Sequence, residues 1–157
     1  MPTHYKGAAR EVRALDAYLK LRRATGSVQT CLDPGLTRRG LTESQFGVLE
    51  ALLHLGPLSQ CEVARKLLRS DGNLTLVVNN LEKAGLVHRQ RDPVDRRRVI
   101  LHLTASGRKT IAGVFPDHLA RIVELLSVLT ADEQITLGNL CRKVGLAAQR
   151  RAEGQAR

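Results

Sequence analysis

The stretch from Ser59 to Thr104 constrains the fold most, because its apolar periodicity changes from helical to strand-like. Ser59 and Glu62 have the spacing of a capping box, in which the two side chains satisfy backbone N–H groups at a helix start. A second stripe has apolar residues at helical spacing: Leu74, Val77, Val78 and Leu81. The residues between these two segments favour turns and helix N-termini: Ser70, Asp71, Gly72 and Asn73. The pattern predicts a helix, a turn and a helix.

Two strand-like segments follow the second helix. Gly85 is the residue type that ends helices in the left-handed conformation. Residues 86–91 and 99–103 alternate apolar and polar side chains, as half-buried strands do. Residues 92–95 (Asp-Pro-Val-Asp) form a turn signal, which places a basic run at the hairpin tip. The expected fold class is mainly α with a small β-hairpin wing (α+β), a winged helix-turn-helix core of the kind that docks on DNA.

The charge of the chain favours a polyanionic partner. The 157 residues are enough for one domain with a core, and the net charge is +10. Residues 59–109 alone contain eleven Lys and Arg against five Asp and Glu. The alternative is a basic protein with no such partner, but this placement of charge indicates nucleic acid. Aromatic residues make up only 3% of the chain, which argues against modules that stack single-stranded bases.

Amphipathic helices are expected on both sides of the winged lobe, which we place at residues 41–104 within a single domain spanning 1–157. The first, residues 8–32, should end at Asp33-Pro34-Gly35. Residues 105–150 should contain two more helices, with a kink or break near Pro116 and a capping box at Thr130 and Glu133. Residues 151–157 read as a polar, disordered tail. The winged module does not need the stripes of residues 8–32 and 105–150, so we assign these segments to dimerisation; a larger monomeric helical domain is the alternative.

Four short motifs occur in the order and spacing of a known family. They are Leu41–Phe46 (LTESQF), Leu81–Val87 (LEKAGLV), Asp95–Arg97 (DRR) and Leu103–Arg108 (LTASGR). Together they resemble the MarR family of bacterial transcription regulators along most of the chain. One position departs from the family pattern, since Leu76 stands where a basic residue is common. A thymine methyl group is a possible partner for this leucine.

The winged module and the resemblance together suggest a set of DNA contacts. The outer side of the helix-turn-helix should face the major groove and its phosphates through Ser59, Gln60, Ser70, Gly72, Asn73, Thr75, Leu76 and Asn79. The resemblance gives Arg97 the minor-groove role, with Asp95 bracing it by a salt bridge. Arg96 and Arg98 would then contact phosphates. The alternatives are a solvated helix face and a generic charged hairpin tip.

The resemblance also implies a homodimer on a pseudo-palindromic double-stranded DNA operator and a small aromatic, often phenolic, effector. Tyr18, His54 and His118 are candidate ligand contacts, although ordinary packing explains each of them as well. The expected function is that of a sequence-specific transcriptional repressor released by its ligand. The alternatives are an oxidant sensor using Cys31 and an effector-independent, nucleoid-type DNA-binding protein. For Cys31 itself, we expect a buried and inert thiol.

Catalysis and metal binding find no support in the sequence. Its histidines are scattered, and its three cysteines are far apart with no metal-ligand spacing. We therefore expect no catalytic residues, no metal, no cofactor and no enzyme activity. No apolar run approaches 18 residues and no signal-peptide pattern is present, so we expect a cytoplasmic protein without a membrane partner.

Overall fold

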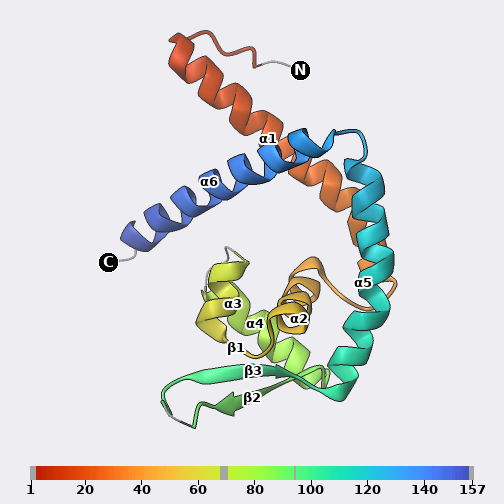
Figure 1. Ribbon diagram of the computed structural model, residues 1–157. Helices are drawn as coiled ribbons and strands as arrows, with labels where there is room; N and C mark the ends of the chain where they lie inside the picture. The colour runs from red at the N-terminus through yellow and green to blue at the C-terminus, as the bar shows by residue number, and fades with distance from the viewer. Residues whose placement is uncertain (1–2, 68–70, 94, 156–157) are drawn as a thin grey trace.

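The computed structural model describes residues 3–67, 71–93 and 95–155, although the side chains of 71–73, 153 and 155 lie outside this description. Six helices and three short strands are found in these ranges (Figure 1). The helices are α1 (Ala9–Thr37), α2 (Glu43–Leu55), α3 (Gln60–Lys66), α4 (Asp71–Lys83), α5 (Ala105–Leu126) and α6 (Ala131–Gln155). The strands are β1 (Leu58–Ser59), β2 (Val87–Arg91) and β3 (Val99–Leu103). The expected class, mainly helical with a small winged sheet, is confirmed.

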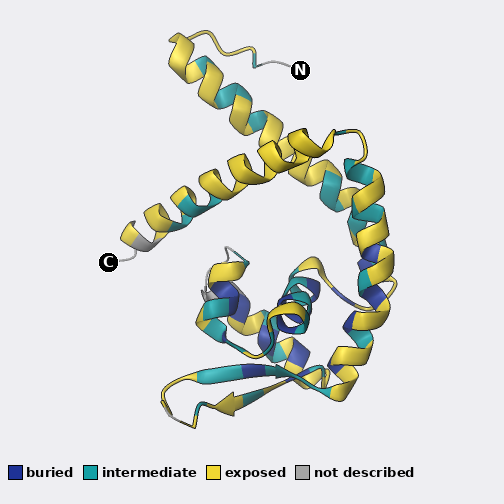
Figure 2. Cartoon of the chain, in the orientation of Figure 1, coloured by how far each residue is buried: buried dark blue, intermediate teal, exposed yellow. Residues whose placement is uncertain are grey.

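The core lies where α2, α4, the sheet and the first half of α5 meet. The most deeply buried side chains come from nearly every element of the lobe: Val48, Leu49, Val63, Val78, Leu81, Leu101 and Ile111. The stripe predicted on α4 is the face that enters this core, because Leu74, Val78 and Leu81 are all buried. Figure 2 shows the buried residues gathered in this lobe. The burial of the α4 stripe leaves the opposite side of that helix free for other contacts.

The sheet joins the helix-turn-helix to the wing. All three strands are antiparallel in the order β1-β3-β2, with Val87 opposite Leu103 and Arg91 opposite Val99. The predicted strand pair is therefore present with a tip at residues 92–98. Strand β1 was not predicted, because only two residues pair with β3 and so short a segment shows no alternation.

Helix α5 begins in direct contact with the sheet. The Thr104 hydroxyl donates to Gly85 O at 2.7 Å and accepts from Gly107 N–H at 2.9 Å, which caps the helix. Gly107 allows the close approach, since a Cβ at this position would lie 1.9 Å from Leu86 O. The first turn of α5 is thus fixed to the start of β2.

The predicted end of the first helix is wrong. Helix α1 continues through Pro34 to Thr37, although a proline inside a helix costs roughly 3 kcal/mol. Continuation places Leu36 in the core with 1% of its surface exposed. The end of the helix is also closed by backbone hydrogen bonds from Arg38 to Pro34 O and from Leu41 to Leu36 O. Tertiary burial and these bonds offset the local cost of proline.

Three other boundaries differ from expectation. Helix α4 begins at Asp71, so part of the predicted turn forms its first turn, where weak helix formers are tolerated because the N–H groups need no intrahelical acceptor. Helix α5 runs through Pro116 without a break. Helix α6 extends to Gln155, so the disordered tail was wrong for residues 151–155, which continue a run rich in Ala, Gln and Arg.

The first half of α1 projects away from the lobe, and α6 runs above the lobe without joining it (Figure 1). Their surfaces are mostly exposed, including apolar side chains such as Tyr18, Leu137, Leu140 and Val144. Within the described residues, no helix is both long and apolar enough to cross a membrane.

Candidate nucleic-acid interface and adjoining cavities

The outer surface of the helix-turn-helix is formed by α3 and α4 together. Gln60 Nε2 donates to Thr75 Oγ1 at 2.7 Å, which joins the first turn of α3 to the exposed side of α4. Leu76 follows on the same helix with 65% of its surface exposed. An exposed leucine at this point is available to meet an apolar group such as a thymine methyl.

Other predicted contacts on these helices are placed differently. Ser59 is 7% exposed, and its hydroxyl donates to Glu62 Oε2 at 2.6 Å while accepting from Glu62 N–H. Its role is to cap α3, which explains the sequence signal without a DNA contact. Ser70 lies outside the described residues. Gly72 and Asn73 belong to the first turn of α4, but their side chains are outside the description as well.

Asn79 is held by a residue that the sequence did not single out. Arg89 on β2 donates from Nη2 to Asn79 Oδ1 at 2.7 Å and forms an ion pair with Glu82. Its backbone N–H also donates to Glu82 Oε1 at 3.1 Å. This cluster attaches α4 to the wing strand β2 and occupies the side-chain oxygen of Asn79 within the protein. The sequence signal that could have indicated Arg89 is a charged residue on the inward face of a predicted strand.

The wing tip is ordered by its two aspartates. Asp95 Oδ1 accepts from the backbone N–H of Arg97 at 3.1 Å, and Asp92 Oδ1 accepts from Asp95 N–H at 3.1 Å. Among the described residues, no ion pair joins the Asp95 and Arg97 side chains, so the contact between them is made by the backbone. The guanidinium groups of Arg96 and Arg97 both belong to exposed residues.

Arg98 connects the wing to α3. Its Nη2 lies 3.5 Å from Glu62 Oε1, the carboxylate that also accepts from Ser59. Hydrogen bonds from the Ser59 side chain and backbone, followed by the charge of Arg98, lower the pKa of Glu62. The Gln60–Thr75 and Arg98–Glu62 contacts thus attach both α4 and the wing to the first turn of α3.

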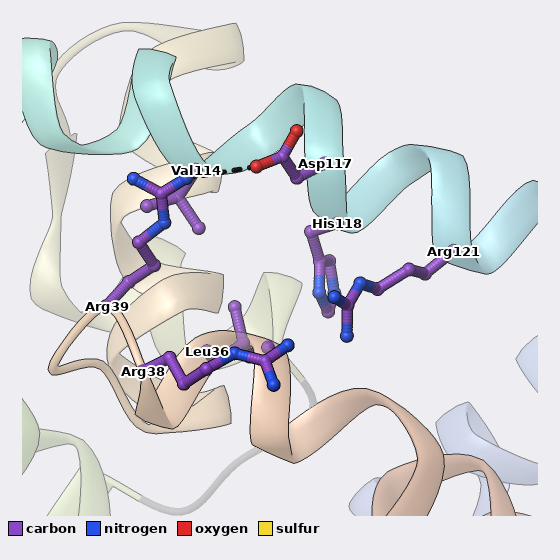
Figure 3. A pocket seen from close by; sticks show the side chains of 8 residues that line it. Leu36, Arg38, Arg39, Val114, Asp117, His118 and Arg121 are labelled. Atoms are coloured by element: carbon purple, nitrogen blue, oxygen red, sulfur yellow. Dashed lines mark hydrogen bonds and ion pairs between the residues drawn. The ribbon is translucent and has the colours of Figure 1, made fainter.

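A second candidate region lies between the end of α1 and the middle of α5. A cavity of about 190 Å³ is lined by Gly35, Leu36, Arg38, Arg39, Val114, Asp117, His118 and Arg121. We call this cavity the arginine cup, after the three arginines that Figure 3 shows around it. Arg39 Nη2 pairs with Asp117 Oδ2 at 3.0 Å, leaving the cup with an excess of positive charge. Such a cup suits an anion.

An apolar cavity of about 310 Å³ adjoins the arginine cup. Its apolar walls come from α1, α2, α5 and the residue that follows α3: Val28, Leu32, Leu36, Phe46, Ile122 and Leu67. Its polar groups come from Gln29, Asp33 and Glu43. Leu36 and His118 line both cavities, so together they form the wall between them. The pair of cavities therefore combines a charged end with an apolar body, a combination that suits a small aromatic anion.

His118 is the only one of the three predicted ligand contacts that lines these two cavities. The residue is 9% exposed, and its ring centroid is 4.4 Å from that of Phe46. Burial, and then the positive charge of Arg121, lowers the pKa of His118, while Glu43 acts in the opposite direction. His54 instead packs against Phe115 with ring centroids 4.8 Å apart, and Tyr18 is 53% exposed on α1.

The cysteines do not assemble into a site. Cys31 is exposed on α1, so the expectation of a buried thiol was wrong: the described residues do not cover the face of α1 that carries it. Cys61 and Cys141 are exposed as well. In the described parts of the chain, no three His, Cys, Asp or Glu side chains are grouped to hold a metal ion.

The arginine cup was missed from the sequence. Arg38 and Arg39 follow α1, whereas Arg121 lies on α5, so only the packing of these helices brings them together. The available signal was His118 itself, a titratable residue next to the apolar stripe of a long helix.

Comparison with known proteins agrees with this architecture. The family model described as MarR family matches residues 41–99. The HTH-type transcriptional regulator MhqR of Bacillus subtilis (strain 168) is 33% identical over 137 residues, covering 87% of this chain and 94% of MhqR. The structure of NadR in complex with 4-hydroxyphenylacetate has a TM-score of 0.73 at 28% identity, covering 92% of this chain and 98% of NadR.

Another similar structure is that of Bordetella bronchiseptica BpsR, described in terms of regulation of its DNA binding by 6-hydroxynicotinic acid. It has a TM-score of 0.73 at 25% identity and covers 92% of this chain and 97% of BpsR. The sequence match extends over both the winged lobe and the long helices, and the same is true of the structural match. This chain belongs to the MarR family and is a DNA-binding transcriptional regulator, not an enzyme.

Proposed function

We propose that the protein is a homodimeric repressor that binds a two-fold symmetric operator and is released by a small aromatic anion. The observation that carries the DNA-binding geometry is that α3 holds both α4 and the wing, through Gln60–Thr75 and Glu62–Arg98. This arrangement can place α4 in the major groove while the wing reaches the adjacent minor groove.

The dimer is supported by apolar surface outside the lobe. Leu137, Leu140 and Val144 recur at helical spacing on α6, and all three are exposed within one chain. Exposed stripes of this kind mark interfaces, and a second copy of the same chain supplies a complementary stripe by symmetry. A two-fold dimer then presents two recognition helices to half-sites about one helical turn apart.

Within this proposal the contacts have distinct roles. Gln60, Thr75 and Leu76 meet base edges, and Ser70, Gly72 and Asn73 remain predicted contacts at the start of the recognition helix. Arg97 enters the minor groove, while Arg96 meets phosphate. Asn79 and Arg98 act first within the protein, through Arg89 and Glu62.

The wing assignment is tested by comparing two arginines. After a binding site is selected from random duplexes, Arg97→Ala should weaken binding to it by about 1–3 kcal/mol and reduce the preference for A·T-rich flanks. Arg142→Ala removes the same charge from an exposed residue of α6 and is the matched control. Equal losses in the two variants, measured by fluorescence anisotropy, would contradict a specific role for Arg97.

The Asp95→Ala substitution distinguishes two effects of Asp95 on DNA binding: holding Arg97 in position, and lowering the positive charge of the wing. The substitution removes a negative charge, so electrostatics alone predicts tighter binding. It also removes the acceptor of the Arg97 backbone N–H, so bracing predicts weaker binding. Tighter binding at every salt concentration would refute bracing.

The effector assignment rests on the two cavities that share His118. We place the anionic group in the arginine cup and the aromatic ring in the apolar cavity, against Leu36 and Phe46. The similar structure of NadR is a complex with 4-hydroxyphenylacetate, and the DNA binding of BpsR is regulated by 6-hydroxynicotinic acid; both compounds are hydroxylated aromatic acids. Binding at a junction of α1, α2 and α5 would stabilise one arrangement of the lobe relative to the long helices.

The experiment is a titration of the protein–operator complex with 4-hydroxyphenylacetate. The Arg121→Gln variant should need at least tenfold more ligand for release from the operator, because a guanidinium facing the carboxylate is lost. Arg142→Gln is the control for total charge. Undiminished release from Arg121→Gln would exclude the arginine cup as the anion site.

A further inference from the structure

His118 has an unsatisfied polar atom at the boundary of the two cavities. Its Nδ1 is buried without a hydrogen-bond partner, and the residue lines both the arginine cup and the apolar cavity. Buried polar atoms in folded proteins nearly always have partners, because an unpaired one costs free energy. A ligand that spans the wall formed by His118 and Leu36 can supply the missing partner.

The charges around His118 come from its own helix and from the two segments packed against it. On α5 they are Asp117 and Arg121; the end of α1 and the residues just after it contribute Asp33, Arg38 and Arg39; and α2 contributes Glu43. Figure 3 shows His118 and Arg121 projecting from α5 toward the end of α1. The arginine cup alone holds three guanidinium groups against one carboxylate. A proton on His118 would add another positive charge to this group at short range.

An anionic ligand reverses that balance. Its carboxylate neutralises part of the cup and accepts a hydrogen bond from a protonated imidazole. The empty site thus favours the neutral ring, in agreement with the lowered pKa of His118, and the occupied site favours the charged ring.

We propose that His118 takes up one proton when an aromatic carboxylate binds across the two cavities, and so makes the regulator more responsive to such anions at low pH. This inference rests on the proposed effector site. The proton moves from solvent to the imidazole nitrogen, and no covalent bond to the ligand forms or breaks.

Proton linkage sets the direction and limit of the effect. Ligand affinity should rise as pH falls through the pKa of His118 in the complex, by up to about tenfold per pH unit for one proton. The increase ends once His118 is protonated in the empty site as well. An uncharged ligand of the same shape brings no negative charge to the imidazole, so its affinity should not show this dependence on pH.

The test is isothermal titration calorimetry of the full-length dimer with 4-hydroxyphenylacetate, from about pH 8 to about pH 5.5, where the ligand stays mainly ionised. Parallel titrations in buffers of different ionisation enthalpy count the protons taken up. The neutral probe is 4-hydroxyphenylacetamide. His118→Gln keeps a polar side chain but cannot titrate, and His54→Gln is the matched control because His54 lines neither cavity.

Between the pKa of His118 in the empty site and its pKa in the occupied site, we expect uptake approaching one proton per acid ligand in the wild type and in His54→Gln, and none in His118→Gln or with the amide. Acid binding without proton uptake would overturn the role of His118 while leaving the effector site in place. Absence of binding at every pH would overturn the effector assignment itself. If His118→Gln does not fold, the wild-type imidazole can be titrated by NMR, and a pKa that does not rise with the ligand would refute the proposal.

Discussion

The recognition helix α4 and the last helix α6 both have apolar stripes, but a single chain buries only the first. Leu74, Val78 and Leu81 on α4 are each at most 2% exposed, whereas Leu140 on α6 is 56% exposed. The same sequence periodicity thus leads to two kinds of stability. The stability of the lobe is a property of one chain. The stability of the α6 region depends on protein concentration.

Leu49→Ala should have the largest effect on folding. Leu49 is fully buried between α2 and its neighbours, so the substitution should cost about 2–5 kcal/mol of unfolding free energy. The cost should be the same at low and high protein concentration in urea denaturation. Leu76→Ala is the matched control, since the same change at an exposed position should cost less than about 0.5 kcal/mol. If the loss of unfolding free energy in Leu49→Ala depended strongly on protein concentration, the contrast between the lobe and α6 would be wrong.

Leu140→Glu should act on assembly instead of on the fold of the lobe. A charge within the α6 stripe should weaken the dimer by about 1–3 kcal/mol, measured by sedimentation equilibrium. Asn139→Glu adds the same charge on the opposite side of α6 and should have little effect. A monomeric wild-type protein at micromolar concentration, or equal effects of the two variants, would contradict an interface on this stripe.

The smallest expected effects on stability come from substitutions in two similar capping boxes, one in the lobe and one at the start of α6. Glu62 caps α3 in the lobe, Glu133 caps α6, and hydrogen bonds from Ser59 and Thr130 lower the pKa of each carboxylate. A lowered pKa contributes stability above the unfolded-state value, and this contribution is lost as pH falls through the folded-state pKa. Below the folded-state pKa of Glu62, the Glu62→Gln variant should therefore have the same unfolding free energy as the wild type, whereas near neutrality it should be slightly less stable.

For Glu133→Gln, hydrogen exchange should show fraying confined to the start of α6, because the rest of that helix lies away from the core. An acid-dependent loss of global stability from Glu133→Gln, equal to that from Glu62→Gln, would show that α6 folds as part of the lobe.

Local signals were enough to predict most elements. The capping boxes at Thr42, Ser59 and Thr130 all have both hydrogen bonds in place, because each involves residues only three positions apart. The sequence also predicted the hairpin, since its turn and alternating strands are adjacent along the chain.

The errors and omissions have a common physical origin in contacts between distant segments. Proline at position 34 indicated a helix end, but the burial of Leu36 against other helices decided otherwise. The role of Arg89 depends on α4, and the arginine cup depends on the packing of α1 against α5. Residue type predicted that Asn79 would face the groove, but the position of β2 gave its oxygen a partner within the protein.

The glycine at the start of α5 has a mechanical consequence. With no side chain at Gly107, the backbone of α5 rests directly on the start of the wing strand, where the Thr104 hydroxyl binds it to Gly85. The same uninterrupted helix passes His118 before it reaches α6. In the proposed dimer this helix would work as a rigid connection fixed to the wing at its start. A small tilt of α5 beside His118 would then move the winged lobe and change the spacing between the two α4 helices.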